Sequence, residues 1–165
     1  MGRLDVVLAV LKYASPDLRL DVRSVEDKIR LQKYVYIMER LGLNLGYSFS
    51  GYLRGPYSPD LANDYYSRAG DVLNLRTSYM LTDKEREVAE KMKDVVTLPT
   101  PVLEALSFLL MKGWLCDDDA VVNVTFLKPH LRPYNVMRAM EVGRRVFGCN
   151  GDPISHENTS YCEDI

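Results

Sequence analysis

The fold is decided by two neighbouring stretches of sequence, KIRLQKYVY at residues 28–36 and GYLRGPYSPDL at residues 51–61. Apolar side chains recur in the first stretch at helical spacing, which predicts a helix from about residue 25 to 41 that ends at Gly42. The second stretch predicts a strand over 47–54, because aromatic residues alternate with small ones. A Gly-Pro pair breaks this strand, and a new helix follows at once.

The helix predicted over 25–41 carries two apolar strips. The wider strip repeats at helical spacing and consists of Leu31, Tyr34, Val35, Met38 and Leu41. The narrower strip lies on the opposite side, among polar residues, and consists of Ile29 and Tyr36. A helix with two apolar strips is either packed between neighbouring elements or presents one strip to a partner.

Polar residues predict where two of the helices begin. Ser24 is the predicted N-cap of the helix with two strips, and Asp27 is its capping-box partner. Ser58 is the predicted N-cap of the next helix, which a proline opens, since proline lacks the N–H that would be wasted there. That helix is expected over about 59–69 and should stop before Gly70.

The rest of the chain predicts more helix than strand. Further helices are expected over the approximate ranges 3–14, 83–96, 100–112, 118–127 and 133–147. Three of them have predicted N-caps, which are Thr82 with its capping-box partner Glu85, Thr100 before a proline, and Asp117. A weaker strand is expected over 75–81. A strand also competes with the helix over 118–127, because valine and threonine have modest helix propensity.

The whole pattern is that of a mainly α protein. We expect a compact multi-helix domain over residues 1–148 with a small β-hairpin, in a winged-helix-like arrangement. From residue 149 to 165 the chain is polar and acidic, and we expect a disordered tail. The formal charge of the chain is −2, so removing the four acids of the tail leaves about +2 for the body. Neither value is the strongly basic balance of a nucleic-acid-binding domain.

The sequence shows no membrane signal and no disulfide framework. No window approaches the roughly 20 apolar residues of a spanning helix, and Asp5 precedes any apolar core, so we expect a cytoplasmic protein with no membrane partner. The cysteines, Cys116, Cys149 and Cys162, form no close pairs, which argues against a disulfide framework and against structural zinc. Cys116 is expected as a small buried apolar residue, while Cys149 and Cys162 could pair under oxidising conditions.

The ionisable residues form no pattern that forces a reaction. His130 is the one histidine inside the predicted domain, and it is expected to bond to a connector backbone or to face water. Asp117, Asp118 and Asp119 are expected to complement a helix N-terminus rather than bind a cation. The phosphate-binding patterns GxxxxGKS/T and GxGxxG do not occur in the sequence. We expect no cofactor, no metal ion and no catalytic residue.

Two candidate binding surfaces remain. Tyrosine and arginine are favoured anchors at protein interfaces. The predicted protein-binding surface consists of Tyr52, Arg54, Tyr57, Ile29 and Tyr36. The alternative is a nucleic-acid surface, because basic side chains on a helix contact phosphates. It consists of Lys28, Lys33, Arg40, Arg138, Arg144 and Arg145. The members on the helix over 25–41 are expected on its exposed side, together with Gln32 and Tyr36.

The motifs also carry a resemblance. A Leu-Gln-Lys helix segment at 31–33, aromatic residues at Tyr47, Phe49 and Tyr52, and a Gly-Pro-Tyr-Ser turn at 55–58 occur together. In this combination the chain resembles the YwgA-like family of small, largely uncharacterised bacterial and archaeal proteins. It is more distantly similar to the Panacea antitoxin domain, which has a comparable Leu-Gln-Lys helix and a Gly-Pro turn. That similarity implies a role in neutralising a toxin by protein contact, and neither family implies a catalytic residue.

We therefore expect a non-enzymatic regulatory module that binds another protein, in an antitoxin-like or adaptor role. The alternative is a winged-helix-type DNA-binding regulator that uses the basic residues. A hydrolase or nuclease that depends on His130 is a third hypothesis.

Overall fold

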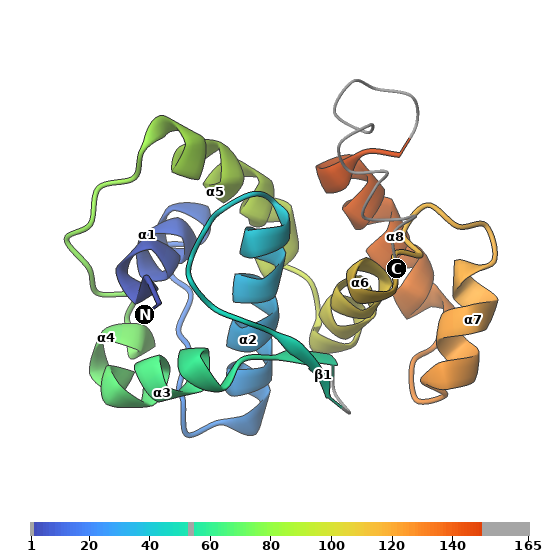
Figure 1. The fold of residues 1–165 in the computed structure, drawn as a ribbon, viewed down its shortest axis with the longest axis horizontal. Coiled ribbons are helices and arrows are strands. Elements are labelled where there is room, and N and C mark those ends of the chain that lie inside the picture. Colours follow the sequence, from blue (N-terminus) through green and yellow to red (C-terminus); the bar gives the residue numbers. More distant parts are fainter. Residues whose placement is uncertain (1, 53–54, 150–165) are drawn as a thin grey trace. The chain divides into compact units, whose positions relative to one another are not determined.

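The computed structural model describes residues 2–52 and 55–149 of the chain. The chain divides into two compact units, Met1–Thr97 (the N-terminal unit) and Leu98–Ile165 (the C-terminal unit). Among the described residues are eight helices and one two-stranded antiparallel sheet (Figure 1), which confirms the predicted mainly helical fold with a small hairpin. The winged-helix-like arrangement and the single domain stay predictions. Apart from Cys149, the predicted tail lies outside the described residues.

The N-terminal unit combines helices with the hairpin. Its elements are α1 (Leu4–Ala14), α2 (Val25–Arg40), β1 (Ser50–Tyr52), β2 (Gly55–Tyr57), α3 (Pro59–Ser67), α4 (Ala69–Leu73) and α5 (Asp83–Val96). α1 packs on α5, while α2 packs against both α5 and β2 (Figure 1). Leu8, Leu11 and Leu31 are among the fully buried side chains of the core that these elements enclose.

α2 begins and ends close to where the sequence predicts. The Ser24 hydroxyl accepts a hydrogen bond from the N–H of Asp27 (3.2 Å), which confirms the N-cap. The reciprocal half of the predicted capping box is wrong, because the Asp27 carboxylate instead accepts the N–H of Asp21 (2.9 Å). α2 is buried without interruption from Leu31 to Met38, so its middle is packed between neighbours, while Ile29 and Leu41 at the ends of the two apolar strips are half-buried.

The hairpin differs from the predicted single strand over 47–54. β1 is short and pairs antiparallel with β2, so that Gly51 lies opposite Pro56. The sequence predicted a break at Gly55 and Pro56, but both belong to β2. Proline is tolerated there because each strand of a two-stranded sheet has an edge without a ladder partner. Gly55 has a φ of 103°, a left-handed value that glycine adopts far more readily than other residues.

The segment after the hairpin confirms the predicted start of α3 and its end before Gly70, and it corrects the strand predicted next. α3 starts at Pro59, and the Ser58 hydroxyl accepts the N–H of Leu61 (3.3 Å), as expected of an N-cap. α3 ends at Ser67, which is before Gly70 as predicted, but the glycine does not end the helix, because α4 runs through it. Gly70 does not have the positive φ with which glycine ends a helix. The strand predicted over 75–81 is wrong, since the described chain has no strand there.

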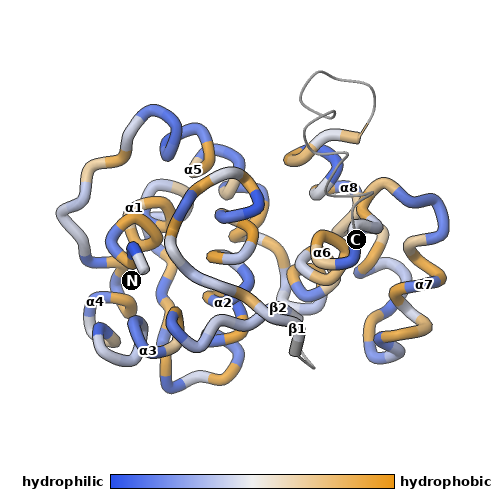
Figure 2. Tube along the Cα trace, viewed as in Figure 1, coloured by the Kyte–Doolittle hydropathy of each residue, from blue (hydrophilic) through white to orange (hydrophobic). Residues whose placement is uncertain are grey.

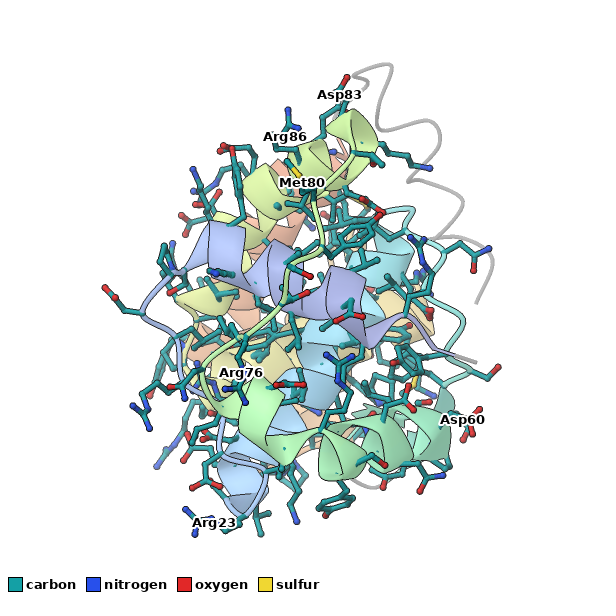
Figure 3. All side chains as sticks on the ribbon, turned by 90° about the vertical axis from the view of Figure 1, so that its left-hand side faces the viewer. Arg23, Asp60, Arg76, Met80, Asp83 and Arg86 are labelled. Atoms are coloured by element: carbon teal, nitrogen blue, oxygen red, sulfur yellow. A yellow bond between two sulfur atoms is a disulfide. The ribbon has the colours of Figure 1, made fainter. Side chains whose placement is uncertain are left out.

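α5 begins with the predicted capping box. The Thr82 hydroxyl accepts the N–H of Glu85 (3.2 Å), and the Glu85 carboxylate accepts the N–H of Thr82 (2.8 Å). One turn of helix also brings Arg86 to within 3.3 Å of the Asp83 carboxylate, and Figure 3 shows both side chains at this exposed helix start. The local sequence therefore fixes the first turn of α5 through reciprocal hydrogen bonds.

The C-terminal unit contains α6 (Thr100–Lys112), α7 (Ala120–Leu127) and α8 (Pro133–Phe147). α6 packs mainly on α8, and α7 packs on α8 and α6. Gly143 permits this packing, because a β-carbon at this position would lie 2.6 Å from a methyl group of Leu115 and 2.8 Å from one of Leu106. Gly113 ends α6 with a φ of 72°, as the sequence predicts.

Two predicted N-caps of this unit are wrong. α6 takes Pro99 as its N-cap, so Thr100 is already the first residue of the helix. α7 starts two residues later than predicted, with Asp119 as its N-cap. The Asp117 carboxylate instead accepts the N–H of Asp119 (2.9 Å), in a turn that precedes the helix. The strand that competed for this segment is also wrong, because α7 is helical.

A disulfide joins Cys116 to Cys149, with their Cα atoms 5.8 Å apart, inside the range for such bonds. This corrects the expectation that Cys116 is a free buried thiol and that the cysteines form no disulfide. The separation of 33 residues along the chain hides the pair, which forms because the end of α8 lies beside the connector from α6 to α7. Cys149 is therefore already bonded, while Cys162 lies outside the described residues.

Candidate functional site

The two stretches that decide the fold meet at one pocket of the N-terminal unit. The pocket has a volume of about 190 Å³ and lies between α2, β2 and α3. Its walls come from residues 25–33 of α2, from residues 55–57 of β2, and from Tyr65 and Tyr66 of α3. We call it the α2–α3 pocket and treat it as the candidate site.

The wall of the α2–α3 pocket is fixed by a contact between Gln32 and Ser58. The side-chain amide of Gln32 donates to the carbonyl of Ser58 (3.0 Å) and accepts its N–H (2.8 Å). Gln32 is 3 % exposed and Ser58 is fully buried, so neither group can bond to water. The two bonds between them supply the partners that burial removes. The Ser58 hydroxyl caps α3 at the same time. One amide thus positions the end of β2 and the start of α3 against α2.

Two neighbouring tyrosines occupy different depths of the pocket. Tyr65 is 1 % exposed, and burial raises the pKa of its phenol to about 12, although a hydrogen bond with Gln32 works in the opposite direction. Tyr65 is therefore a neutral phenol at physiological pH. The ring of Tyr66 packs edge-to-face on Tyr65, with 4.9 Å between ring centroids, and is 54 % exposed. Tyr66 therefore belongs to the rim of the pocket.

The charges around the α2–α3 pocket have one sign. Lys28 and Lys33 are part of its lining, and none of the described lining residues is acidic. Lys28 lies at the rim, where its ammonium donates to the hydroxyl of Tyr66 (3.0 Å) and lies 5.5 Å from the centre of that ring. The Lys33 side chain is buried. The pocket therefore favours an occupant that brings a negative charge to its rim.

The predicted protein-binding residues fall into three groups. Ile29 and Tyr57 are half-buried and line the α2–α3 pocket together. Tyr36 does not join them: it is 7 % exposed, packs edge-to-face on Phe49, and accepts a hydrogen bond from Arg40 (3.0 Å). The predicted surface at Tyr36 is wrong in this respect, because α2 is covered on that side. The side chain of Tyr52 and all of Arg54 lie outside the described residues.

The predicted basic face of α2 is only partly exposed. Lys33, Gln32 and Tyr36 are buried, which corrects the expectation that they lie on an exposed side. The helix has two apolar strips because it is enclosed, and the polar residues between the strips are enclosed with them. Lys28 and Arg40 are half-buried and both donate to tyrosine hydroxyls, those of Tyr66 and Tyr36.

The predicted basic residues of α8 are engaged within the C-terminal unit. Arg138 and Arg145 both bond to the carboxylate of Glu141, at 2.9 Å and 3.4 Å, and about half of each arginine side chain is exposed. Arg144 is half-buried and donates through Nε to the carbonyl of Leu115 (2.9 Å). The exposed positive charge of this helix is therefore smaller than its sequence indicates.

His130 is exposed, which agrees with one of its two predicted environments, but it bonds to a carboxylate and not to the connector backbone. Its Nε2 is hydrogen-bonded to the carboxylate of Glu104 on α6, and its side chain is 59 % exposed. The ammonium of Lys128 lies 3.6 Å from the same carboxylate and 5.0 Å from the centre of the Phe108 ring. This arrangement ties the connector between α7 and α8 to α6, and it gives His130 a structural role.

Metal ligands do not gather anywhere in the described part of the chain, where no group of three His, Cys, Asp or Glu side chains has a geometry suited to a metal ion. Among the same residues, no helix has both the length and the apolar character that crossing a bilayer requires.

Sequence reasoning missed Tyr65, Tyr66 and the role of Gln32. The tyrosines are the seventh and eighth residues of the helix after the Gly-Pro turn, near its C-terminal end. The helix start was predicted correctly, so the position of Tyr65 followed from it in principle. The Gln32 contact spans 26 residues, and no local pattern signals it.

No family model, no curated protein and no solved structure matches this chain. The α2–α3 pocket is therefore interpreted from its own chemistry.

Proposed function

We propose that this chain is a non-enzymatic regulatory module that binds another protein, in an adaptor or antitoxin-like role, and that the α2–α3 pocket holds an anchoring side chain of the partner. One observation carries the proposal: two motif stretches close around a pocket whose lining is mainly apolar and aromatic. Aromatic residues are enriched at protein interfaces, and partner anchors fill pockets of this kind.

The size of the pocket supports a side chain as the occupant. Its volume of about 190 Å³ is below the roughly 300–1,000 Å³ that is usual for sites of small molecules and cofactors. One large side chain of a partner is a better match than a nucleotide or a drug-sized ligand. Ile29, Pro56 and Tyr57 offer the apolar contacts that such a side chain needs.

The charge of the pocket supports an acidic neighbour for that anchor. Lys28 is at the rim, and the described lining contains no carboxylate that would neutralise it. A partner segment with an apolar or aromatic anchor next to an Asp or Glu would place its carboxylate near this ammonium. Charge complementarity of this type raises the association rate and selects among partners more than it raises affinity.

The proposal is tested by affinity capture from the native host, with the wild-type protein and single variants as baits. Tyr57→Ala and Ile29→Ala should each weaken binding of a stoichiometric protein partner at least about fivefold, because truncating an interface anchor costs more than about 1 kcal/mol. Tyr13→Ala is the matched control, since Tyr13 is an exposed tyrosine that does not line this pocket. Equal capture by all four baits would count against the α2–α3 pocket.

The charge at the rim is tested separately. Lys28→Glu should slow association with the captured partner and remove most of the salt dependence of the rate. Lys12→Glu, at an exposed lysine of α1 that does not line the pocket, should leave both unchanged. An unaltered association rate in the Lys28 variant would argue against an acidic partner segment.

A DNA-binding regulator is the second candidate, supported by the half-exposed side chains of Arg138 and Arg145 on α8. Both arginines share the carboxylate of Glu141, which reduces the charge available for phosphates. This candidate predicts duplex binding that weakens steeply as salt rises, and Arg138→Ala should flatten that dependence by roughly one unit of slope. We also propose a cytoplasmic location for the protein-binding module. The disulfide between Cys116 and Cys149 argues against it, because such bonds are rare in a reducing compartment, and fractionation of the native host decides between the two.

A further inference from the structure

α7 exposes apolar side chains that a helix of this composition normally buries. Its eight residues contain no ionisable side chain, and only Ala120 and Val124 are buried. Val122 is 69 % exposed, Phe126 is 82 % exposed and Leu127 is 51 % exposed. A helix that is apolar all round usually lies inside a protein, and an exposed apolar patch of a soluble domain marks an interaction surface.

Two of the exposed residues of α7, Val122 and Phe126, share one side of the helix. Val122 and Phe126 are four residues apart, so they are neighbours on the helix surface. On α8, the other helix that packs on α7, Tyr134 and Met137 are 69 % and 59 % exposed. Figure 2 shows α7 as a largely hydrophobic segment with hydrophilic residues before and after it. We call the exposed side of α7 that bears Val122 and Phe126 the α7 face.

Charges of opposite sign flank the α7 face. Asp117, Asp118 and Asp119 precede the helix, and all three are exposed. Arg132 follows the helix and is exposed as well. The sequence from 117 to 132 thus runs from acidic through uncharged to basic over a helix about 12 Å long.

We propose that the α7 face binds the α7 face of a second copy of this chain, with the two helices antiparallel about a two-fold axis. An antiparallel arrangement places the aspartates of each copy next to Arg132 of the other. Both contacts form in the same register, because the distance between the acidic and basic ends is identical in the two copies. A two-fold axis makes the interface self-complementary, which is the commonest symmetry among homo-oligomers.

Charge selects a second copy over other occupants. The α7 face is uncharged, so two copies meet without like-charge repulsion along the helices. A parallel pairing would place aspartates against aspartates, and it is disfavoured since like charges in an interface cost several kcal/mol. The proposal is independent of the α2–α3 pocket, because the residues that carry it belong to the C-terminal unit.

The first test measures the mass of the full chain in solution by sedimentation equilibrium over a range of concentrations. The wild-type mass should rise from that of one chain towards that of two. Phe126→Ser should keep the mass of one chain over the same range, because it removes the most exposed apolar side chain of the α7 face. Met80→Ser is the matched control, since Met80 is 86 % exposed in the N-terminal unit, and it should associate like the wild type. A wild-type mass of one chain throughout, or an unaffected Phe126 variant, would overturn the proposal.

The second test addresses the antiparallel arrangement. A variant with Asp118→Lys and Asp119→Lys should have two basic ends, and an Arg132→Glu variant should have two acidic ends. Each alone should dimerise at least about tenfold more weakly than the wild type, while an equimolar mixture should form a heterodimer close to wild-type affinity. The side chain of Asp119 makes no capping bond, so replacing it removes no hydrogen bond from the start of α7. A mixture no tighter than the separate variants would exclude this arrangement.

Discussion

The amide of Gln32 pairs with both backbone polar groups of Ser58, as a residue on a neighbouring strand would. The two bonds are 2.8 Å and 3.0 Å long and connect the middle of α2 to the start of α3. Because β2 ends at Tyr57, the next residue would otherwise lack a partner for its buried N–H. A side chain thus continues the hydrogen bonding of the hairpin by one residue.

Removing this amide should destabilise the N-terminal unit. Gln32→Met keeps most of the volume and deletes both hydrogen bonds. The carbonyl of Ser58 keeps the N–H of Ala62, but the buried N–H of Ser58 loses its acceptor, so we expect the free energy of unfolding to fall by about 2 kcal/mol. Urea unfolding followed by circular dichroism measures the change. Gln32→Ala should cost more, because it adds a cavity. A Met variant as stable as the wild type would show that water satisfies Ser58 equally well.

The N-cap of α3 gives a second stability prediction. Ser58→Ala should lower the free energy of unfolding by about 1 kcal/mol, because the N–H of Leu61 loses its acceptor. Ser67→Ala is the matched control: its hydroxyl donates to the carbonyl of Asn63 on an exposed turn, and its removal should have little effect. If both variants melt at the wild-type temperature, the cap contributes nothing measurable.

Acid should destabilise the fold through Glu85. Burial raises the pKa of this carboxyl, but hydrogen bonds from Thr82 and Tyr79 and the charge of Arg3 outweigh burial, so the pKa lies below its ordinary value of 4.5. A lowered pKa means that the ionised group stabilises the folded state above pH 4.5, and that this stabilisation is lost as the pH falls through the lowered value.

Urea unfolding between pH 7 and pH 3 measures this loss. The free energy of unfolding of Glu85→Gln should depend less on pH in the acid range than that of the wild type, because the variant has no carboxyl to protonate at this position. Identical acid dependence in the two proteins would mean that other carboxyls, such as Asp5 beside Arg68, account for the effect.

Breaking the disulfide should destabilise the C-terminal unit. The bond closes a loop with a sequence separation of 33 residues, for which chain entropy predicts a loss of about 3–4 kcal/mol on reduction. Thermal unfolding with and without a dithiol reductant measures this loss. The double variant Cys116→Ser with Cys149→Ser is the control and should show no response to reductant. A wild-type melting curve that reductant does not change would contradict the pairing.

The sequence predicted those boundaries that depend on residues within one turn of each other. The N-caps at Ser24, Ser58 and Thr82 all bond to a group three residues away, and all three are formed. Gly113 follows the same logic at the end of α6. Local hydrogen bonds of this kind leave a local pattern in a single sequence, but the same pattern also placed N-caps wrongly at Thr100 and Asp117.

Contacts between distant residues could not be predicted. Gln32 and Ser58 are 26 residues apart, and Cys116 and Cys149 are 33 apart. Neither pair has a spacing that signals contact. The burial of Lys33 was also missed, because a lysine on a helix is normally solvated and only the packing of neighbouring elements around α2 encloses it. The sequence therefore predicted Ile29 and Tyr57 as binding residues, but it did not predict that they line a pocket.

The disulfide has a consequence for how the protein responds to proteases. All of α7 and α8 lies between Cys116 and Cys149, so this part of the chain forms a covalent ring. A single cut in the exposed connector near Arg132 would open the ring without releasing a fragment. The nicked protein would run as one species on a non-reducing gel and as two on a reducing gel. α7 therefore stays covalently attached to α8 after a cut near Arg132, through the disulfide.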